Sequence, residues 1–296
     1  MHILVTGGTG FIGSALLPAL AECEHSVTVL SRQSIANTAS VGYISDLDEI
    51  DASRPVDAVI NLAGASLAGR RWTAAYKREI VASRLDTTAA LIDWIERREQ
   101  RPSTLLSASA IGYYGHQGDE LLDEIAEAVP GFAQQLCQDW EQQAMRAPDL
   151  GVRTCLLRLG VVLARGGGAF QQMAAPFALG VGNWIGDGRQ WLSWVHRDDV
   201  VRAILFLLQD ESLSGPFNLT APEPVTSRGF CEGMRQHYRT LLNLPMPAPV
   251  MRLLVGEMAD ELLIHGQRVM PVALEEAGFS FSYPQLSDAL AAIKAS

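Results

Sequence analysis

The feature that most constrains this chain is a glycine-rich turn near its N-terminus. The run Gly7–Gly13 (GGTGFIG) directly follows an apolar, β-branched stretch at residues 3–6 and opens an amphipathic stretch at residues 11–22. Glycines permit the backbone angles of such a turn and let a pyrophosphate approach the backbone. The free N–H groups of the following helix then attract phosphates. Strand, turn and helix in this order predict a dinucleotide-binding unit rather than a turn without a ligand.

Two glycine spacings overlap in this turn. Gly8, Gly10 and Gly13 satisfy GxGxxG, whereas Gly7, Gly10 and Gly13 satisfy GxxGxxG. We expect the cofactor to contact the turn at Gly7, Thr9, Gly10, Phe11, Ile12 and Gly13.

The end of the second predicted strand indicates which dinucleotide is bound. NAD enzymes usually place Asp or Glu there to accept hydrogen bonds from the ribose 2′-OH. This chain has no carboxylate in the segment Val29–Gln33 (VLSRQ). Instead, Arg32 can pair with a 2′-phosphate and Ser31 can donate a hydrogen bond to it. The pattern favours NADP(H), the alternative being a surface arginine that merely closes the strand.

Short β-branched runs alternate with longer amphipathic stretches, which is typical of βαβ units on a parallel sheet. Predicted strands cover residues 3–6, 27–30, 58–62, 104–107, 154–159 and 217–219, and predicted helices cover 11–22, 74–95 and 132–147. From about Pro222 prolines interrupt the helical segments. We therefore expect an α/β fold: a Rossmann-type, doubly wound parallel sheet domain at 1–221, with substrate-lobe elements inserted around 166–197. A smaller mixed, mainly helical C-terminal lobe at 222–296 would complete it.

Charge and cysteine content limit the partners. With 23 Lys plus Arg against 33 Asp plus Glu, the net charge of −10 argues against nucleic acid or an anionic membrane as partner. The four cysteines form no CxxC pair, so neither a disulfide framework nor a metal site is predicted. We expect no basic leader, and the sequence contains no apolar run of the ~18 residues that a membrane span requires. We expect a cytoplasmic protein, monomeric or homodimeric, that binds a small-molecule substrate.

Serine and tyrosine residues follow the fourth predicted strand. Ser107–Ala110 and Tyr113–Gly115, together with the glycine turn and Asn61–Gly64, resemble the extended short-chain dehydrogenase/reductases, which include the nucleotide-sugar epimerases. In that family a strand-end serine and a Tyr-x-x-x-Lys pair transfer protons. The lysine and the oxidised nicotinamide lower the tyrosine pKa. The resemblance implies that Ser109 occupies the catalytic serine position.

The Tyr-x-x-x-Lys pair is missing from the sequence. None of the six tyrosines is followed four residues later by lysine. Aligning the family's lysine with Cys137, and the glutamate beyond it with Glu141, puts Ala133 at the tyrosine position. Proton transfer would then fall to Tyr113, Tyr114 or water. Packing under the turn is the alternative for both tyrosines, whose ordinary pKa near ~10 makes a poor base. For Cys137 there are two interpretations: a thiol that acts as an acid, or an inert buried cysteine.

Further motifs resemble those of the atypical, epimerase-like members of this family, which are labelled nucleoside-diphosphate-sugar epimerase family. This resemblance extends over nearly the whole chain. The motifs are Glu79–Arg84, Phe132–Glu141, Arg158–Leu163, Gly166–Gly168, Gly186–Trp191, Ser193–Asp199, Pro247–Pro249 and Gly266–Pro271. The resemblance implies that Ser31 and Arg32 hold the 2′-phosphate. It also implies cofactor contacts by Asn61, Leu62, Ala63, Gly64, Glu79, Arg84 and Val162, with Leu62 and Ala63 along the adenosine ribose and Val162 near the nicotinamide. A solvated charge pair is the alternative for Glu79 and Arg84, and core packing for Val162.

A histidine and two aspartates, His196, Asp198 and Asp199, suggest an acid/base or metal cluster. Because a helix is predicted to begin there, capping by the aspartates is the better interpretation. Trp184, Trp191 and Trp194 would floor a cleft by stacking or bridge the two lobes.

Taken together, the residues and the resemblance predict an NADP(H)-dependent oxidoreductase or epimerase-like enzyme acting on a small polar or nucleotide-linked substrate. The alternative is a non-catalytic NADPH-binding sensor or a partner-binding protein.

Overall fold

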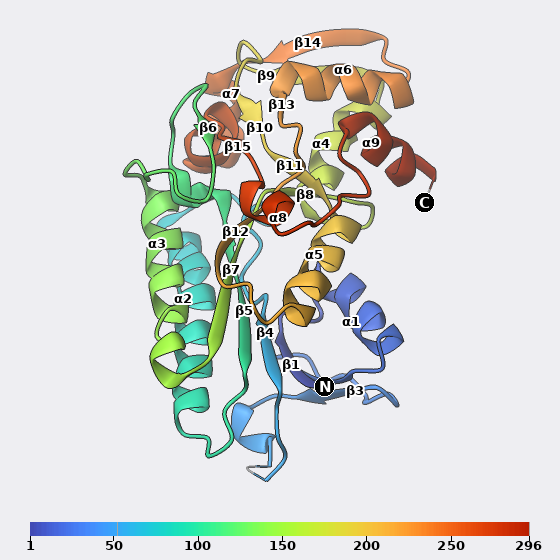
Figure 1. The fold of residues 1–296 in the computed structure, drawn as a ribbon. Coiled ribbons are helices and arrows are strands. Elements are labelled where there is room, and N and C mark those ends of the chain that lie inside the picture. Colours follow the sequence, from blue (N-terminus) through green and yellow to red (C-terminus); the bar gives the residue numbers. More distant parts are fainter. Residues whose placement is uncertain (52, 296) are drawn as a thin grey trace.

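The centre of the molecule is a seven-stranded parallel sheet (Figure 1). The computed structural model describes residues 1–51 and 53–295, so Ser296 of the predicted C-terminal lobe lies outside the described residues. The strand order is β12-β7-β5-β4-β1-β2-β3. The strands are β1 (His2–Thr6), β2 (Ser26–Leu30), β3 (Val41–Ile44), β4 (Ala58–Asn61), β5 (Thr104–Ala110), β7 (Arg153–Leu159) and β12 (Gly215–Leu219). This order confirms the predicted doubly wound parallel sheet.

The direction in which the chain adds strands reverses beside β1. The chain runs outward from β1 to β3 and then returns to place β4 on the other side of β1. In such sheets a crevice opens at the reversal, outside the carboxyl ends of the strands, and ligands bind there. The glycine turn follows β1 at this position.

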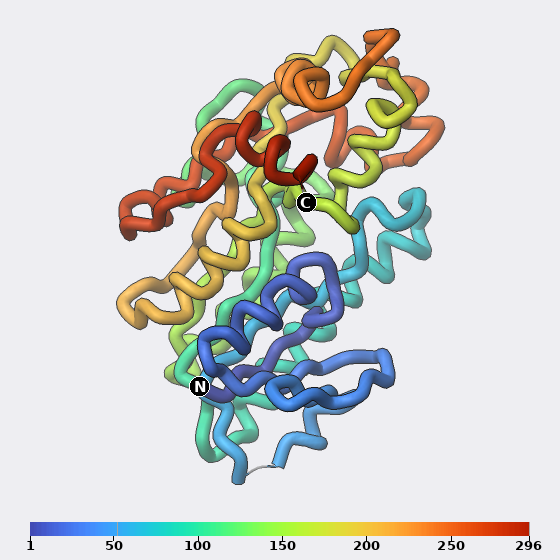
Figure 2. The backbone as a smooth tube through the Cα atoms, turned by 90° about the vertical axis from the view of Figure 1, so that its right-hand side faces the viewer, coloured from blue at the N-terminus to red at the C-terminus, as the bar shows by residue number. Residues whose placement is uncertain are grey.

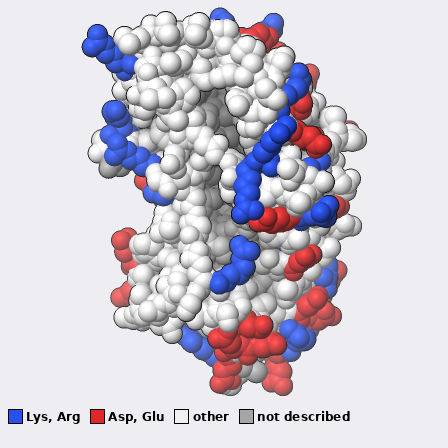
Figure 3. Space-filling model, turned by 180° about the vertical axis from the view of Figure 1, so that it is seen from behind, with Lys and Arg blue, Asp and Glu red and all other residues white. Residues whose placement is uncertain are grey.

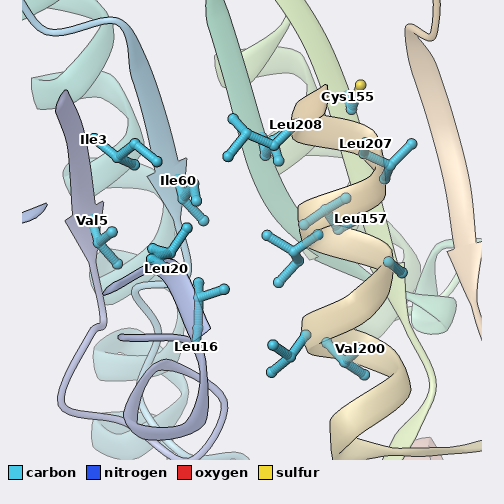
Figure 4. Packing of buried hydrophobic residues seen from close by; sticks show 14 of the residues in the cluster. Ile3, Val5, Leu16, Leu20, Ile60, Cys155, Leu157, Val200, Leu207 and Leu208 are labelled. Carbon is cyan, nitrogen blue, oxygen red and sulfur yellow. The ribbon is translucent and has the colours of Figure 1, made fainter. Parts of the chain in front are cut away.

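Helices cover both faces of the sheet (Figure 1). On one face lie α1 (Gly13–Glu22) and α5 (Arg197–Gln209), and on the other α2 (Ala74–Glu96) and α3 (Phe132–Ala144). Alternate residues of β1 serve the two layers: Ile3 and Val5 join the core with α1 and α5, whereas Leu4 joins the core with α2. Figure 4 shows the first core, with Leu16 and Leu20 of α1 packed beside β1.

The C-terminal lobe lies above the carboxyl ends of the strands (Figures 1 and 2). Its longer helices are α4 (Gly168–Ala178), α6 (Ser227–His237), α7 (Ala248–Val255) and α9 (Leu286–Ala295), with the short α8 (Val272–Glu276). The described part also contains four two-stranded sheets. They pair β10 (Trp191–Leu192) with β13 (Val225–Thr226), β11 (Trp194–His196) with β8 (Val161–Leu163), β14 (Leu242–Met246) with β9 (Val181–Ile185), and β15 (Arg268–Val269) with β6 (Leu121–Leu122). One core contains Phe177 and Trp194 as well as Met234 and Leu290. The elements around 166–197 therefore pack with the C-terminal helices.

The start of α5 differs from the sequence expectation. The N-cap is His196, whose Nδ1 accepts a hydrogen bond from the backbone N–H of Asp198 (3.2 Å). The expectation that the aspartates cap this helix is wrong. Asp199 instead accepts hydrogen bonds from the backbone N–H groups of Ser282 (2.8 Å) and Tyr283 (2.9 Å), and so ties the C-terminal segment to α5.

Among the described residues, no helix combines the length and the apolar character that a membrane span requires.

Candidate functional site

At two positions of the turn between β1 and α1, neighbouring backbone atoms leave no room for a side chain. Gly7 has φ +69°, and a Cβ there would lie 2.5 Å from the carbonyl oxygen of Leu62. A Cβ on Gly13 would lie 2.5 Å from Cα of Gly8. The turn is closed by a hydrogen bond from Gly10 N–H to Gly7 O (2.9 Å). This packing holds the start of α1 against the turn and brings Leu62 alongside.

The outer side of the turn is open to a ligand. Thr9 and Gly10 are exposed, and Phe11 and Ile12 are half-buried. The N-cap of α1 is Ile12, and no side chain accepts a hydrogen bond from this helix N-terminus. The N–H groups of Ser14 and Ala15 already donate to Gly10 O (2.9 Å) and Ile12 O (3.0 Å). Among the described residues, those of Phe11, Ile12 and Gly13 have no acceptor, so they remain available for phosphate oxygens.

Ser31 and Arg32 lie one strand away from the turn. Leu30 pairs with Thr6, so both residues follow β2 at the level where Gly7 follows β1. Ser31 is buried, its N–H donates to Ile44 O (2.9 Å), and its Oγ accepts from the N–H of Gln33 (3.0 Å). Arg32 is exposed. The fixed Ser31 backbone therefore presents the guanidinium of Arg32 to solvent at the carboxyl edge of the sheet.

Two hollows lie near this edge of the sheet, and they differ in charge. One, of about 390 Å³, adjoins the turn and is lined by uncharged residues that include Gly8, Thr9, Ser14, Thr38 and Tyr43. The other, of about 550 Å³, is lined by Asp46, Asp48, Asp93 and Glu96 together with Arg97, and this excess of carboxylates would disfavour a phosphate. Figure 3 shows a hollow in the middle of one face, with Lys and Arg side chains along one side of it, whereas acidic residues gather at the lower end of the molecule.

The side chain of Asn61 makes its hydrogen bonds with other buried side chains of the protein. It is fully buried: its Oδ1 accepts from Thr6 Oγ1 (2.6 Å), and its Nδ2 donates to Thr88 Oγ1 (2.8 Å) and Ser107 Oγ (3.2 Å). These bonds tie together β1, β4, β5 and α2. Asn61 has no surface left for a ligand, whereas the next residues, Leu62, Ala63 and Gly64, are half-buried or exposed.

Arg84 contacts the loop that follows Asn61, at Gly64 and Ala65. Its guanidinium donates to Ile80 O (3.0 Å) and Ala65 O (3.1 Å), and a Cβ on Gly64 would lie 3.1 Å from its Cζ. Burial lowers the pKa of Arg84. Glu79 does not pair with it; its carboxylate lies 3.6 Å from Arg70 and is 48% exposed. The structure therefore places Arg84 directly against the loop and Glu79 on the surface of α2.

Ser109 is bound to a buried ion pair. Its hydroxyl donates to Glu141 Oε1 (2.6 Å), and both oxygens of Glu141 accept from Arg158, from Nε and Nη2 at 2.9 Å each. The side chains of Arg158 and Glu141 are only 4% and 8% exposed. Ser109, on β5, faces Arg158 on the neighbouring β7, and Glu141 comes from α3. In this arrangement the Ser109 proton is committed to Glu141.

The two candidate tyrosines have different surroundings. Tyr114 is fully buried; its hydroxyl donates to Asn218 Oδ1 (2.7 Å) and accepts from Arg158 Nη1 (3.0 Å). Burial raises the pKa of Tyr114 to about 12, which removes it further from use as a base. Tyr113 is half-buried, with Cζ of Arg158 3.5 Å from the centre of its ring. Of Ser109, Tyr113 and Tyr114, Tyr113 alone retains an accessible surface.

Apolar packing fills the positions of the missing dyad. The 3₁₀ turn η2 (Ile111–Tyr114) lies against α3, and a Cβ on Gly112 would lie 3.3 Å from Cβ of Ala133 and 3.5 Å from Sγ of Cys137. Burial, reinforced by the charge of Glu141, raises the pKa of the Cys137 thiol to about 12. Neither position offers a group that exchanges a proton near neutral pH.

The remaining candidates lie on short strands outside the seven-stranded sheet. Val162 is half-buried on β8 (Val161–Leu163), paired with Val195 of β11 (Trp194–His196). His196 is buried with its ring centre 4.1 Å from that of Tyr283, and burial lowers its pKa. Within the described ranges, no three His, Cys, Asp or Glu side chains are placed to hold a metal ion. Trp194 belongs to the lobe core.

The strand order of the parallel sheet reverses beside β1, and a hydrogen-bonded glycine turn lies at that point. Together these features define a dinucleotide-binding α/β protein of the Rossmann type. The chain belongs to the NAD dependent epimerase/dehydratase family, whose model matches residues 3–219. A second model, a domain of unknown function (DUF1731), matches residues 246–293. These matches confirm the resemblance found in the sequence.

Relatives match over nearly the full length. An epimerase family protein of Mycobacterium bovis is 40% identical over 290 residues, covering 97% of this chain and 96% of the relative. One of Staphylococcus aureus is 36% identical over 292 residues, with 97% of each covered. The crystal structure of the human epimerase family protein SDR39U1 with NADPH has a TM-score of 0.91 and 32% identity, covering 100% of this chain and 99% of the other.

Proposed function

We propose that this protein binds NADP(H) and is an atypical short-chain dehydrogenase/reductase, an oxidoreductase or epimerase-like enzyme for a small polar or nucleotide-linked substrate. The observation that carries the proposal is the pairing of an open glycine turn with Ser31 and Arg32 at the end of β2, where no carboxylate stands. An arginine there suits a 2′-phosphate, whereas a carboxylate would suit a free 2′-OH. The human relative crystallised with NADPH supports the same choice.

The residues around the cleft suggest how a proton would be supplied. Bound NADPH would provide a hydride equivalent. Tyr113 is half-buried beside the strand ends, and the Arg158 guanidinium, 3.5 Å from the centre of its ring, would hold the ring in place. Glu141 and Ser109 would act by holding Arg158 in position. We assign Tyr113 as the proton donor and Arg158 as its positioning residue.

One observation favours a second candidate function, an NADPH sensor without turnover. The two dyad positions are filled by Ala133 and a buried Cys137, and the Ser109 hydroxyl donates its hydrogen bond to Glu141.

To distinguish the enzyme from the sensor, purified protein is incubated with NADPH and panels of aldehydes, ketones and nucleotide sugars, while absorbance and sugar interconversion are followed. Turnover that is lost in Tyr113→Phe supports the enzyme. Tight NADPH binding without turnover on any panel supports the sensor.

Replacing Arg32 by glutamine should weaken NADPH binding about tenfold and leave NADH binding unchanged, because a charge-assisted hydrogen bond to the 2′-phosphate is lost. The Kd values for both dinucleotides are measured by calorimetry. The matched control is Arg235→Gln, an exposed arginine of α6, which should change neither value. An Arg32→Gln protein that still prefers NADPH by the original factor would contradict the assignment of the 2′-phosphate site.

A further inference from the structure

A second arginine lies beside the glycine turn, against the ring of Phe11. Arg197 is the first residue of α5, and its Cζ is 5.1 Å from the centre of the Phe11 ring. Phe11 is also enclosed by Gly167 and Gly168, where a Cβ would lie 2.9 Å and 2.6 Å from ring carbons. The glycine run before α4 and the start of α5 therefore meet on the side chain of a residue whose backbone belongs to the turn.

In the part of the chain that the structure describes, the positive charge of Arg197 has no acidic partner. No ion pair among the described residues includes Arg197, although the chain carries 33 acidic residues. Its neighbours are engaged elsewhere: Asp198 lies 3.6 Å from His196, and Asp199 binds Arg202 and two backbone N–H groups. A half-buried guanidinium that nothing neutralises is suited to an anionic ligand.

The hydrogen-bonding state of Arg197 points in the same direction. Its Nε is buried and, like the Nε atoms of Arg153 and Arg268, has no acceptor within the described residues, while the residue as a whole is half-buried. Buried polar groups normally find a partner, and an exception calls for an explanation such as a missing ligand. A guanidinium presents several donors in one plane, which matches phosphate oxygens.

We propose that Arg197 is a second cation of the cofactor site and binds the pyrophosphate of the dinucleotide from the side opposite to the backbone N–H groups of the turn. This assignment rests on the proposed function, because it requires the dinucleotide to lie on the glycine turn. It differs from the role of Arg32, which would contact only the 2′-phosphate. Arg197 would therefore contribute to binding of NADPH and NADH alike, since both contain the pyrophosphate.

The test compares Arg197→Gln with the wild-type protein by calorimetric titration with NADPH and NADH. We expect both Kd values to rise about tenfold, so that their ratio is unchanged, whereas Arg32→Gln changes the ratio. The matched control is Arg228→Gln, which removes a guanidinium 4.9 Å from the ring centre of Trp184 in the C-terminal lobe. The control should bind both dinucleotides as the wild type does.

The outcomes separate the two proposals. If the wild type binds neither dinucleotide, the proposed function fails and the role of Arg197 fails with it. If the wild type binds NADPH and Arg197→Gln binds both dinucleotides equally well, only the pyrophosphate assignment is overturned. A loss confined to NADPH would place Arg197 at the 2′-phosphate and would also overturn it.

A measurement on the wild-type protein covers the case in which the variant does not fold. Phenylglyoxal modifies accessible arginines, and peptide mapping by mass spectrometry locates the modified positions. We expect NADPH and NADH each to protect Arg197, but not Arg235, from modification. Equal modification of Arg197 with and without saturating NADPH would contradict the proposal.

Discussion

Replacing Glu141 by alanine is expected to lower the free energy of unfolding by about 3–5 kcal/mol, because the substitution leaves the buried guanidinium of Arg158 without its counter-ion. Arg158 donates two hydrogen bonds to this carboxylate, and its side chain is only 4% exposed. Ser109 loses its acceptor in the same substitution. Urea denaturation followed by circular dichroism measures the change.

An exposed ion pair of the same molecule supplies the control. Asp93 on α2 lies 2.8 Å from Arg146, with side chains 58% and 43% exposed. Because solvent screens such pairs, Asp93→Ala should change the free energy of unfolding by no more than about 1 kcal/mol. If Glu141→Ala costs as little as Asp93→Ala, the ion pair does not hold α3, β5 and β7 together as described.

Replacing Gly13 by alanine is the second change with a large expected effect. The added Cβ would meet the backbone of Gly7 and Gly8, and backbone atoms cannot move aside as a flexible side chain can. Overpacking of this kind costs about 1–3 kcal/mol of stability. The turn must also shift, so we expect NADPH affinity to fall at least tenfold, measured by calorimetry on protein shown to be folded.

Gly42 provides the matched substitution. It lies on β3, and a Cβ there would lie 4.0 Å from the nearest atom, the carbonyl oxygen of Val27. Gly42→Ala should leave both the stability and the NADPH affinity within error of the wild type. A Gly13→Ala protein that binds NADPH as well as Gly42→Ala does would show that the turn tolerates a side chain at that position.

The sheet and the turn could be predicted from the sequence because their signals are local. Apolar β-branched runs placed β1, β2, β4, β5, β7 and β12 within a few residues of their observed bounds. The largest differences are at two ends: β5 continues to Ala110 instead of ending at 107, and α3 ends at Ala144 instead of 147. The short strand β3 (Val41–Ile44) was not predicted, because its four residues include a glycine and depend on pairing with β2.

The surroundings of the candidate site could not be predicted, because they depend on contacts between distant segments. Ser109 and Glu141 are 32 residues apart in the chain, and Tyr114 and Asn218 are 104 apart. One local signal is present in the sequence: Arg158 is the charged residue in the interior of the strand Arg153–Leu159 (RTCLLRL), whose other charge, Arg153, stands at its first position, and a buried arginine requires a partner. The partner itself comes from α3 and becomes known only from the structure.

The central claim is that the carboxyl edge of the sheet holds a phosphorylated dinucleotide between the glycine turn and Arg32. Calorimetric titration of the wild-type protein with NADPH and, separately, with NADH tests it most directly. We predict saturable binding of NADPH with at least about tenfold higher affinity than that of NADH. Absence of heat with either dinucleotide, or a preference for NADH, would contradict the account.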